Sequence, residues 1–173
     1  MNATAPDRSA FALLLHASAT QRFAAVAFAC AAAVSLALVG QHVYDLRPCP
    51  WCIVQRLIYV ALGVFALLGA LLASRPVRFA LAGGSLLLAV SGAAAAIWHS
   101  MVASKSTSCN LTLADKVLNA LGVETLWPSM FQVTASCAGS AVRVLGLYFE
   151  QWSLLLFLVL AVVAASTLLK LRA

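Results

Sequence analysis

The chain alternates between long apolar stretches and shorter polar ones. The apolar stretches lie at about residues 22–40, 52–73, 79–101 and 150–169. Each is close to the roughly 20 residues that an α-helix needs to cross the hydrocarbon of a bilayer. Lipid offers the backbone no hydrogen-bond partners, so helices are the expected form of such segments. The pattern predicts an all-α integral membrane protein, with a four-transmembrane-helix bundle that forms a single membrane domain over residues 1–173.

Two polar segments, at about 41–51 and 102–149, are expected on the same side of the membrane. The longer one contains apolar residues at helical spacing. These are Leu113, Val117, Leu118, Leu121 and Leu126. The spacing predicts a short helix that lies on the membrane surface, with a plain solvated loop as the alternative.

The first and third apolar stretches carry finer signals. "FALLLHASA", before the first stretch, ends like a signal cleavage site, but its apolar core is shorter than a signal peptide needs, so a retained anchor is expected. Small residues in the third stretch predict close helix packing. They are Gly83, Gly84, Ser91 and Gly92.

Composition supports the membrane class. The chain has 173 residues, of which 64% are hydrophobic and 9% are charged, whereas soluble domains carry about 25% charged residues. The net charge of +6 does not indicate a nucleic-acid-binding protein, because the basic residues are scattered.

The distribution of charge predicts the orientation. Six basic residues and one acid belong to the side that holds both termini, and five basic residues and four acids belong to the other. By the positive-inside rule, both termini face the cytoplasm and the two polar segments face the exterior. Four tryptophans fall near the outer interface, as an aromatic belt would. They are Trp51, Trp98, Trp127 and Trp152.

Four of the five cysteines map to the exterior side, as the pairs Cys49/Cys52 and Cys109/Cys137, while Cys30 is expected to be a packing residue in the first helix. An even number of cysteines on an oxidising side predicts two disulfides. A purely structural bond would suit Cys109 and Cys137, since closing 27 intervening residues stabilises the fold by roughly 3 kcal/mol. The C-x-x-C pair closes a loop too short to gain much, and is typical of thiol–disulfide chemistry. A zinc site made of the four cysteines is a further alternative.

Two polar residues lie near the C-x-x-C pair. Arg56 follows Cys52 by four residues, on the same helix face and about 6 Å deeper. A cation there favours the thiolate of Cys52, and its donors suit the carbonyl of a lipid-soluble acceptor. Alternatively, Arg56 snorkels to the lipid head groups. His99 ends the third stretch at a similar level, either as an interfacial residue or in one polar pocket with Arg56. Two thiols that form a disulfide release two electrons, so a quinone is a fitting acceptor.

Several stretches together resemble the disulfide bond formation protein B (DsbB) family of bacterial inner-membrane quinone reductases. They are "QHVYDLRPCPWCIVQR", "IWHSM", Cys109, "WPSMFQVTASC" and "LGLYFEQWSLL". The resemblance implies that Cys49, Cys52, Cys109 and Cys137 are catalytic, that Arg56, Cys52 and His99 bind the quinone, and that no metal takes part. Pro50-Trp51 between the first two cysteines departs from the best-known family pattern.

The resemblance also implies a reaction: a membrane thiol oxidase that reoxidises a periplasmic, DsbA-like thioredoxin-fold dithiol oxidant. The partner would form a mixed disulfide at Cys109, Cys137 would exchange with Cys49, and Cys52 would pass two electrons to ubiquinone or menaquinone. The protein would be a multi-pass inner-membrane protein, with cytoplasmic termini and periplasmic cysteine loops. The alternatives are a vitamin K epoxide reductase-like thiol–quinone oxidoreductase, and a non-enzymatic membrane protein stapled by disulfides.

Overall fold

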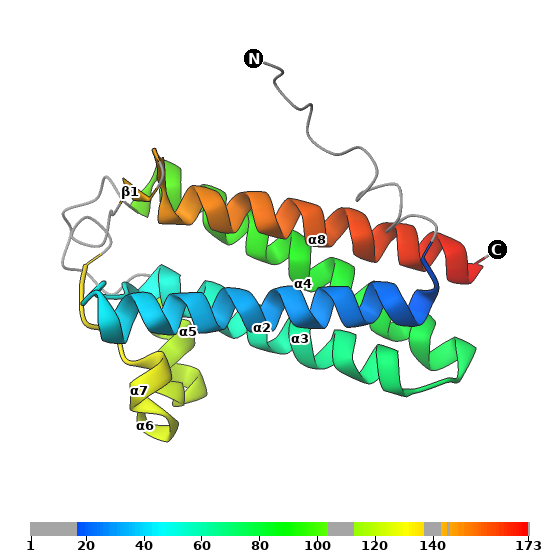
Figure 1. Cartoon of the computed structure of the whole chain (residues 1–173). Coiled ribbons are helices and arrows are strands. Elements are labelled where there is room, and N and C mark those ends of the chain that lie inside the picture. Colours follow the sequence, from blue (N-terminus) through cyan, green and yellow to red (C-terminus); the bar gives the residue numbers. More distant parts are fainter. Residues whose placement is uncertain (1–16, 104–112, 137–142, 145, 173) are drawn as a thin grey trace, which may run out of the picture.

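Four long helices lie side by side and form a bundle (Figure 1). The computed structural model describes residues 17–103, 113–136, 143–144 and 146–172. The long helices are α2 (Ala19–Val43), α3 (Pro50–Leu71), α4 (Arg75–Met101) and α8 (Phe149–Arg172). Each is long and apolar enough to cross a membrane. The predicted fold class, an all-α membrane protein with four spanning helices, is confirmed.

Local sequence determines where the helices begin. Ser18 starts α2 with a capping box, in which its hydroxyl accepts a hydrogen bond from the Gln21 backbone N–H and the Gln21 side chain accepts one from the Ser18 N–H. Helix α3 begins at Pro50, with Cys49 as its N-cap, two residues earlier than the hydropathy pattern predicts. Proline is favoured at this position because its fixed φ suits the helix and its missing N–H would be unpaired there anyway. As a result, Cys49 caps α3 and Cys52 lies in its first turn.

The interior of the bundle is apolar and draws on all four long helices. The buried core consists of Phe23, Val26, Cys30, Tyr59, Leu62, Ala66, Ala82, Ala89, Ala93, Phe157, Leu160 and Val163. The rings of Tyr59 and Phe157 stack with their centroids 4.1 Å apart, and the Tyr59 hydroxyl donates to the Ser153 carbonyl. Cys30 belongs to this core, as expected. Many large apolar side chains on the outer faces stay exposed, which suits a lipid environment.

Two of the four small residues predicted to allow close packing in α4 do so. A Cβ at Gly84 would lie 2.5 Å from the Phe65 ring, and one at Gly92 would lie 2.3 Å from the Phe157 ring. At Gly83 nothing lies within 4 Å, and Ser91 is exposed. The prediction was therefore wrong for Gly83 and Ser91, because it did not take into account which face of the helix is turned inward.

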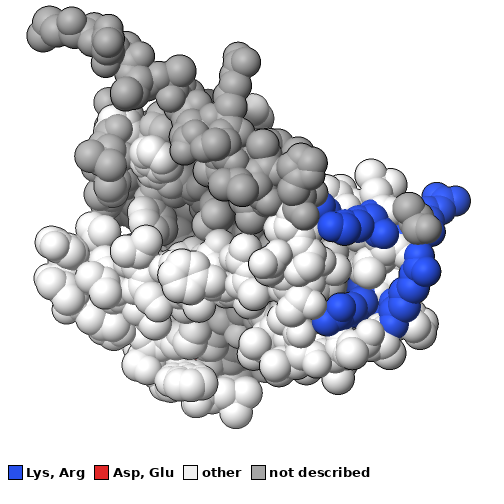
Figure 2. Space-filling model, turned by 45° about the vertical axis from the view of Figure 1, so that its right-hand side comes forward, with Lys and Arg blue, Asp and Glu red and all other residues white. Residues whose placement is uncertain are grey.

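One end of the bundle carries a group of basic residues. They are Arg22, Arg75, Arg78, Lys170 and Arg172, at the starts of α2 and α4 and the end of α8. Figure 2 shows Lys and Arg gathered at one end of the molecule, with no described Asp or Glu in view on that face. Some of these cations join helix ends: Arg75 Nε donates to the Leu171 carbonyl and Arg78 Nη2 donates to the Thr20 hydroxyl. The described residues of the predicted cytoplasmic side thus lie together.

The opposite end carries three short helices and a small hairpin. They are α5 (Leu113–Leu121), α6 (Val123–Leu126), α7 (Pro128–Phe131), β1 (Arg143–Val144) and β2 (Leu147–Tyr148), with β1 and β2 antiparallel. Helix α5 confirms the predicted short helix, and its Ala114 and Leu118 are buried beside α3 residues such as Ile53. It stops at Gly122, whose φ of 62° is the left-handed conformation that glycine favours. The hairpin was not predicted.

Candidate functional site

Cys49 is the N-cap of α3 and Cys52 lies in the first turn of that helix, at the end of the bundle that carries the short helices. The Cys49 sulfur accepts a hydrogen bond from the Cys52 backbone N–H at 3.3 Å, and the two sulfur atoms are 2.8 Å apart. Cys49 has an exposed fraction of 0%, whereas Cys52 is partly exposed and lines a cavity. The first turn therefore places one sulfur inside the protein and the other at an open space.

His99 connects the buried cysteine to a polar side chain of α3. Its Nε2 lies 3.4 Å from the Cys49 sulfur, and its Nδ1 lies 3.3 Å from the Gln55 amide nitrogen. The imidazole is only 3% exposed, so it is held inside the protein and is not a residue of the membrane interface. The contact with Cys49 also shows that His99 lies beside the cysteine pair as well as beside the cavity.

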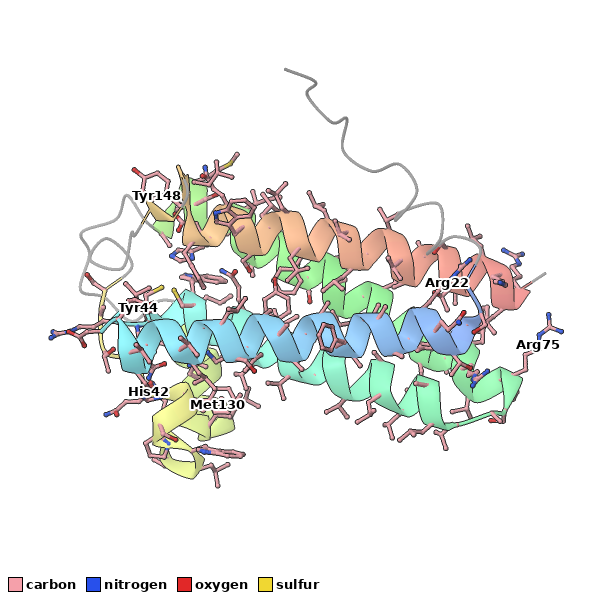
Figure 3. All side chains as sticks on the ribbon, in the orientation of Figure 1. Arg22, His42, Tyr44, Arg75, Met130 and Tyr148 are labelled. Carbon is pink, nitrogen blue, oxygen red and sulfur yellow. The ribbon has the colours of Figure 1, made fainter. Side chains whose placement is uncertain are left out.

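Arg56 is buried and binds oxygen atoms of the protein. Its Nη1 donates to the Gln41 side-chain oxygen at 2.8 Å and to the Met130 carbonyl. Figure 3 shows Met130 beside the same end of α2 that carries Tyr44. The side chain is 5% exposed and interacts electrostatically with Cys52. The alternative in which Arg56 reaches for lipid head groups does not fit these contacts.

A cavity of about 200 Å³ lies between α2, α3 and α8, beside the cysteine pair. Most of its lining is apolar and comes from Ala33, Val34, Leu36, Ala37, Gly40, Leu46, Phe149, Trp152 and Leu156. The polar lining includes Cys52, Gln55, Arg56, His99 and Glu150. Arg56 Nε is buried and has no hydrogen-bond partner among the described residues, so the guanidinium retains an unused donor. A flat apolar molecule with a polar carbonyl fits such a lining.

The sulfur atoms of Cys49 and Cys52 and a ring nitrogen of His99 all lie within 4.8 Å of one another. This spacing would allow a metal ion with two thiolate ligands and one imidazole ligand. The zinc site considered from the sequence was a different set, because it also used Cys109 and Cys137. Those two cysteines lie outside the described residues.

The segment that leads to Cys137 is fixed next to Cys49. The backbone N–H groups of Thr134 and Ala135 donate to the Pro48 carbonyl at 3.0 and 3.2 Å, and Pro48 directly precedes Cys49. Earlier in the segment, the Ser129 carbonyl accepts a hydrogen bond from the Gln41 amide at 3.4 Å. Contacts to α2 and to the start of α3 therefore hold residues 129–135 over the site.

Comparison with known proteins identifies the family. The chain matches the family described as "Disulfide bond formation protein DsbB" over residues 19–167. This chain belongs to that family. It is 35% identical to disulfide bond formation protein B 1 of Pseudomonas syringae pv. syringae over 83% of this chain and 85% of the relative. It is 34% identical to disulfide bond formation protein B of Dechloromonas aromatica, over 87% of this chain and 91% of that one.

DsbB membership confirms the resemblance drawn from the motifs, and it favours this family over the vitamin K epoxide reductase-like alternative. The chain is a multi-pass inner-membrane protein of disulfide bond formation, with the role of a disulfide oxidoreductase.

Three residues of the site were missed by sequence reasoning. Gln41 and Met130 bind Arg56 from distant segments, which no local pattern reveals. The sequence does point to Glu150, since it is an acid in the first turn of a long apolar helix. In the charge pattern it counts only among the four acids of the exterior side.

Proposed function

We propose that this protein is a protein-dithiol:quinone oxidoreductase. It reoxidises a periplasmic, DsbA-like thioredoxin-fold oxidant and passes two electrons through two cysteine pairs to a membrane quinone. The observation that carries the proposal is that Cys52 and Arg56 line the same largely apolar cavity, while Cys49 lies directly behind Cys52. In this arrangement, a dithiol adjoins a space suited to a lipid-soluble acceptor.

The residues around the cavity fit a quinone, either ubiquinone or menaquinone. The apolar lining suits its ring and tail, and the unused donor of Arg56 suits a carbonyl oxygen. Arg56, Cys52 and His99 would hold the quinone, which supplies an acceptor for two electrons and two protons. Arg56 also stabilises the negative charge of the Cys52 thiolate, with which it interacts electrostatically.

The second cysteine pair relays electrons from the partner. Cys109 is the sulfur that the reduced partner attacks, which gives a mixed disulfide, and Cys137 then exchanges with Cys49. Support comes from the two hydrogen bonds between the segment before Cys137 and the Pro48 carbonyl. Cys137 follows Ala135 by only two residues, so the chain can bring its sulfur to Cys49 without a long excursion.

The orientation follows from charge. The basic end of the bundle, with Arg75 and Lys170, belongs in the cytoplasm together with both termini, and the end with the short helices belongs in the periplasm. The exposed apolar residues of α5 and α6, such as Leu113 and Leu126, then lie at the periplasmic membrane surface. Labelling a single cysteine introduced near Asp45 from outside intact cells tests this topology, and labelling only after lysis would contradict it.

The function is tested by anaerobic mixing of the purified protein, a reduced thioredoxin-fold partner and a quinone, with the quinone absorbance followed in time. The wild-type protein and Cys30→Ala are expected to reduce the quinone at the same rate, since Cys30 lies in the apolar core. Cys52→Ser is expected to abolish reduction while the protein stays folded. Unchanged reduction by Cys52→Ser would instead favour a disulfide-stapled membrane protein without enzymatic activity.

A further inference from the structure

Glu150 is a buried acid for which the cysteine chemistry has no evident use. It lies in the first turn of α8 with an exposed fraction of 6%, and it lines the cavity together with Cys52 and His99. A buried charge is costly unless something compensates it, and no hydrogen-bond partner of its carboxylate is found within the described part of the chain. Glu150 and His99 are close enough to interact electrostatically. A carboxyl group kept at a cavity under these conditions is a candidate for proton transfer.

The other ionisable groups around this cavity come from three segments. Arg47 precedes α3, His99 belongs to α4, and α3 contributes a cysteine, an arginine and a tyrosine. Those three are Cys52, Arg56 and Tyr59. The Tyr59 hydroxyl is engaged with Ser153, and Arg56 remains charged and donates hydrogen bonds. Glu150 and His99 are therefore the two groups of the lining, besides the thiol itself, that can both take up and release a proton.

Resting on the proposed function, we propose that His99 and Glu150 carry a proton from the Cys49 thiol to the acceptor in the cavity. In the reaction, two S–H bonds break and one S–S bond forms between Cys49 and Cys52, while two electrons and two protons pass to the acceptor and form two O–H bonds. His99 Nε2, which contacts the Cys49 sulfur, accepts the Cys49 proton. Glu150 passes a proton to one acceptor oxygen, and the proton given up by Cys52 reaches the other.

Gln55 has a positioning role in this path. Its amide contacts Nδ1 of His99 while Nε2 faces the Cys49 sulfur. With the amide oxygen turned toward an Nδ1–H, Nε2 is free to accept the Cys49 proton. An amide offers both a donor and an acceptor, which allows it to serve the ring in either protonation state. Glu150 and His99 both line the cavity whereas Cys49 does not, so the Cys49 proton reaches the cavity through these two residues.

The first test uses Glu150→Gln, which keeps the shape of the side chain and removes its proton. General acids typically contribute 10²–10⁴-fold to a rate, so we expect kcat for quinone reduction to fall about 100-fold with an unchanged pH dependence of mixed-disulfide formation. The matched control is Asp45→Asn, which removes an acid at the same end of the bundle whose side chain is 83% exposed. An equal kcat in Glu150→Gln and Asp45→Asn would overturn the proton path. If the wild-type protein itself reduced no quinone, the proposed function would fail instead.

The second test does not depend on turnover, and its one variant, Glu124→Gln, leaves Glu150 in place. The chain has two glutamates, Glu124 and Glu150, so glutamate labelled with ¹³C at its carboxyl carbon reports on two groups. In quinone-free wild-type protein, oxidation of the dithiol by a small chemical oxidant should increase the infrared band of a protonated labelled carboxyl group, and the increase should persist in Glu124→Gln. No change in that band on oxidation, or its loss in Glu124→Gln, would show that Glu150 does not receive the proton.

Discussion

Replacing Arg56 with alanine tests the acceptor site at the group with the most direct role. The substitution removes a buried cation from the cavity together with its unused donor, and it leaves Cys52 without that charge. A hydrogen bond to a charged group contributes about 1.5–3 kcal/mol, and each 1.4 kcal/mol is about tenfold in affinity. The KM for quinone should therefore rise about 10- to 150-fold in Arg56→Ala.

The same change has a structural cost that must be separated from the loss of binding. Gln41 and the Met130 carbonyl lose the donor that Arg56 Nη1 supplies, and a buried acceptor without a partner costs about 1–3 kcal/mol. Arg56→Lys helps to separate the two effects, because it restores a cation but lacks the guanidinium fork that reaches several oxygens at once. Its KM should lie between those of the wild type and Arg56→Ala.

The assay is steady-state quinone reduction in detergent, with reduced partner in excess and the quinone concentration varied. Lys116→Ala is the matched control, since it removes an exposed cation of α5 and should leave the KM within about twofold. Trapping of the mixed disulfide with the partner should survive in Arg56→Ala and report that the protein is folded. A KM that matches the wild type in folded Arg56→Ala would remove Arg56 from the acceptor site.

Two further predictions concern helix packing and the segment of residues 129–135 that leads to Cys137. Gly92→Ala should lower the free energy of unfolding in detergent by about 1–3 kcal/mol, because the new Cβ would meet the buried Phe157 ring at 2.3 Å. Gly83→Ala is the control, since open space surrounds that position and its stability should not change. Equal stabilities of the two variants would refute the packing. Thr134→Pro removes the backbone N–H that binds the Pro48 carbonyl, so partner-driven turnover should fall about two- to tenfold. Quinone reduction driven directly by a small dithiol should stay unchanged, and a parallel loss there would indicate general damage.

The sequence predicts the spanning helices well because their signal is local. Each apolar stretch must satisfy its own backbone inside lipid, so length and hydropathy define the element without knowledge of its neighbours. The helix ends differ from the predicted bounds by up to four residues, as at α4, which starts at Arg75 and not at residue 79. Those ends depend on caps and on proline, which hydropathy does not register. Gly83 shows the complementary limit, since only the packed bundle reveals which helix face is turned inward.

The residues of the site also divide into those that local spacing predicts and those that only the folded chain brings together. Arg56 follows from its spacing to Cys52, because residues four apart share a helix face. The contact of His99 with Cys49 joins residues 50 positions apart, and that of Arg56 with Met130 joins residues 74 apart. Such contacts depend on how helices rotate and how a loop folds back, which no periodicity encodes. Glu150 could have been recognised from the sequence alone, since an acid inside an apolar helix is costly enough to require a reason.

The burial of the Cys49/Cys52 pair gives the second cysteine pair a reason in the proposed function. Among the described residues, Cys49 is fully buried and Cys52 opens toward a largely apolar cavity, so neither sulfur is displayed on an exposed surface that a folded partner could reach easily. Thiol–disulfide exchange requires the attacking sulfur to reach its target. In the proposed function, electrons from a water-soluble partner would arrive on a sulfur carried by a segment of this chain, and the segment tied to Pro48 ends two residues before Cys137. The burial that sets Cys49 behind Cys52 is thus the same feature that gives the proposed relay its purpose.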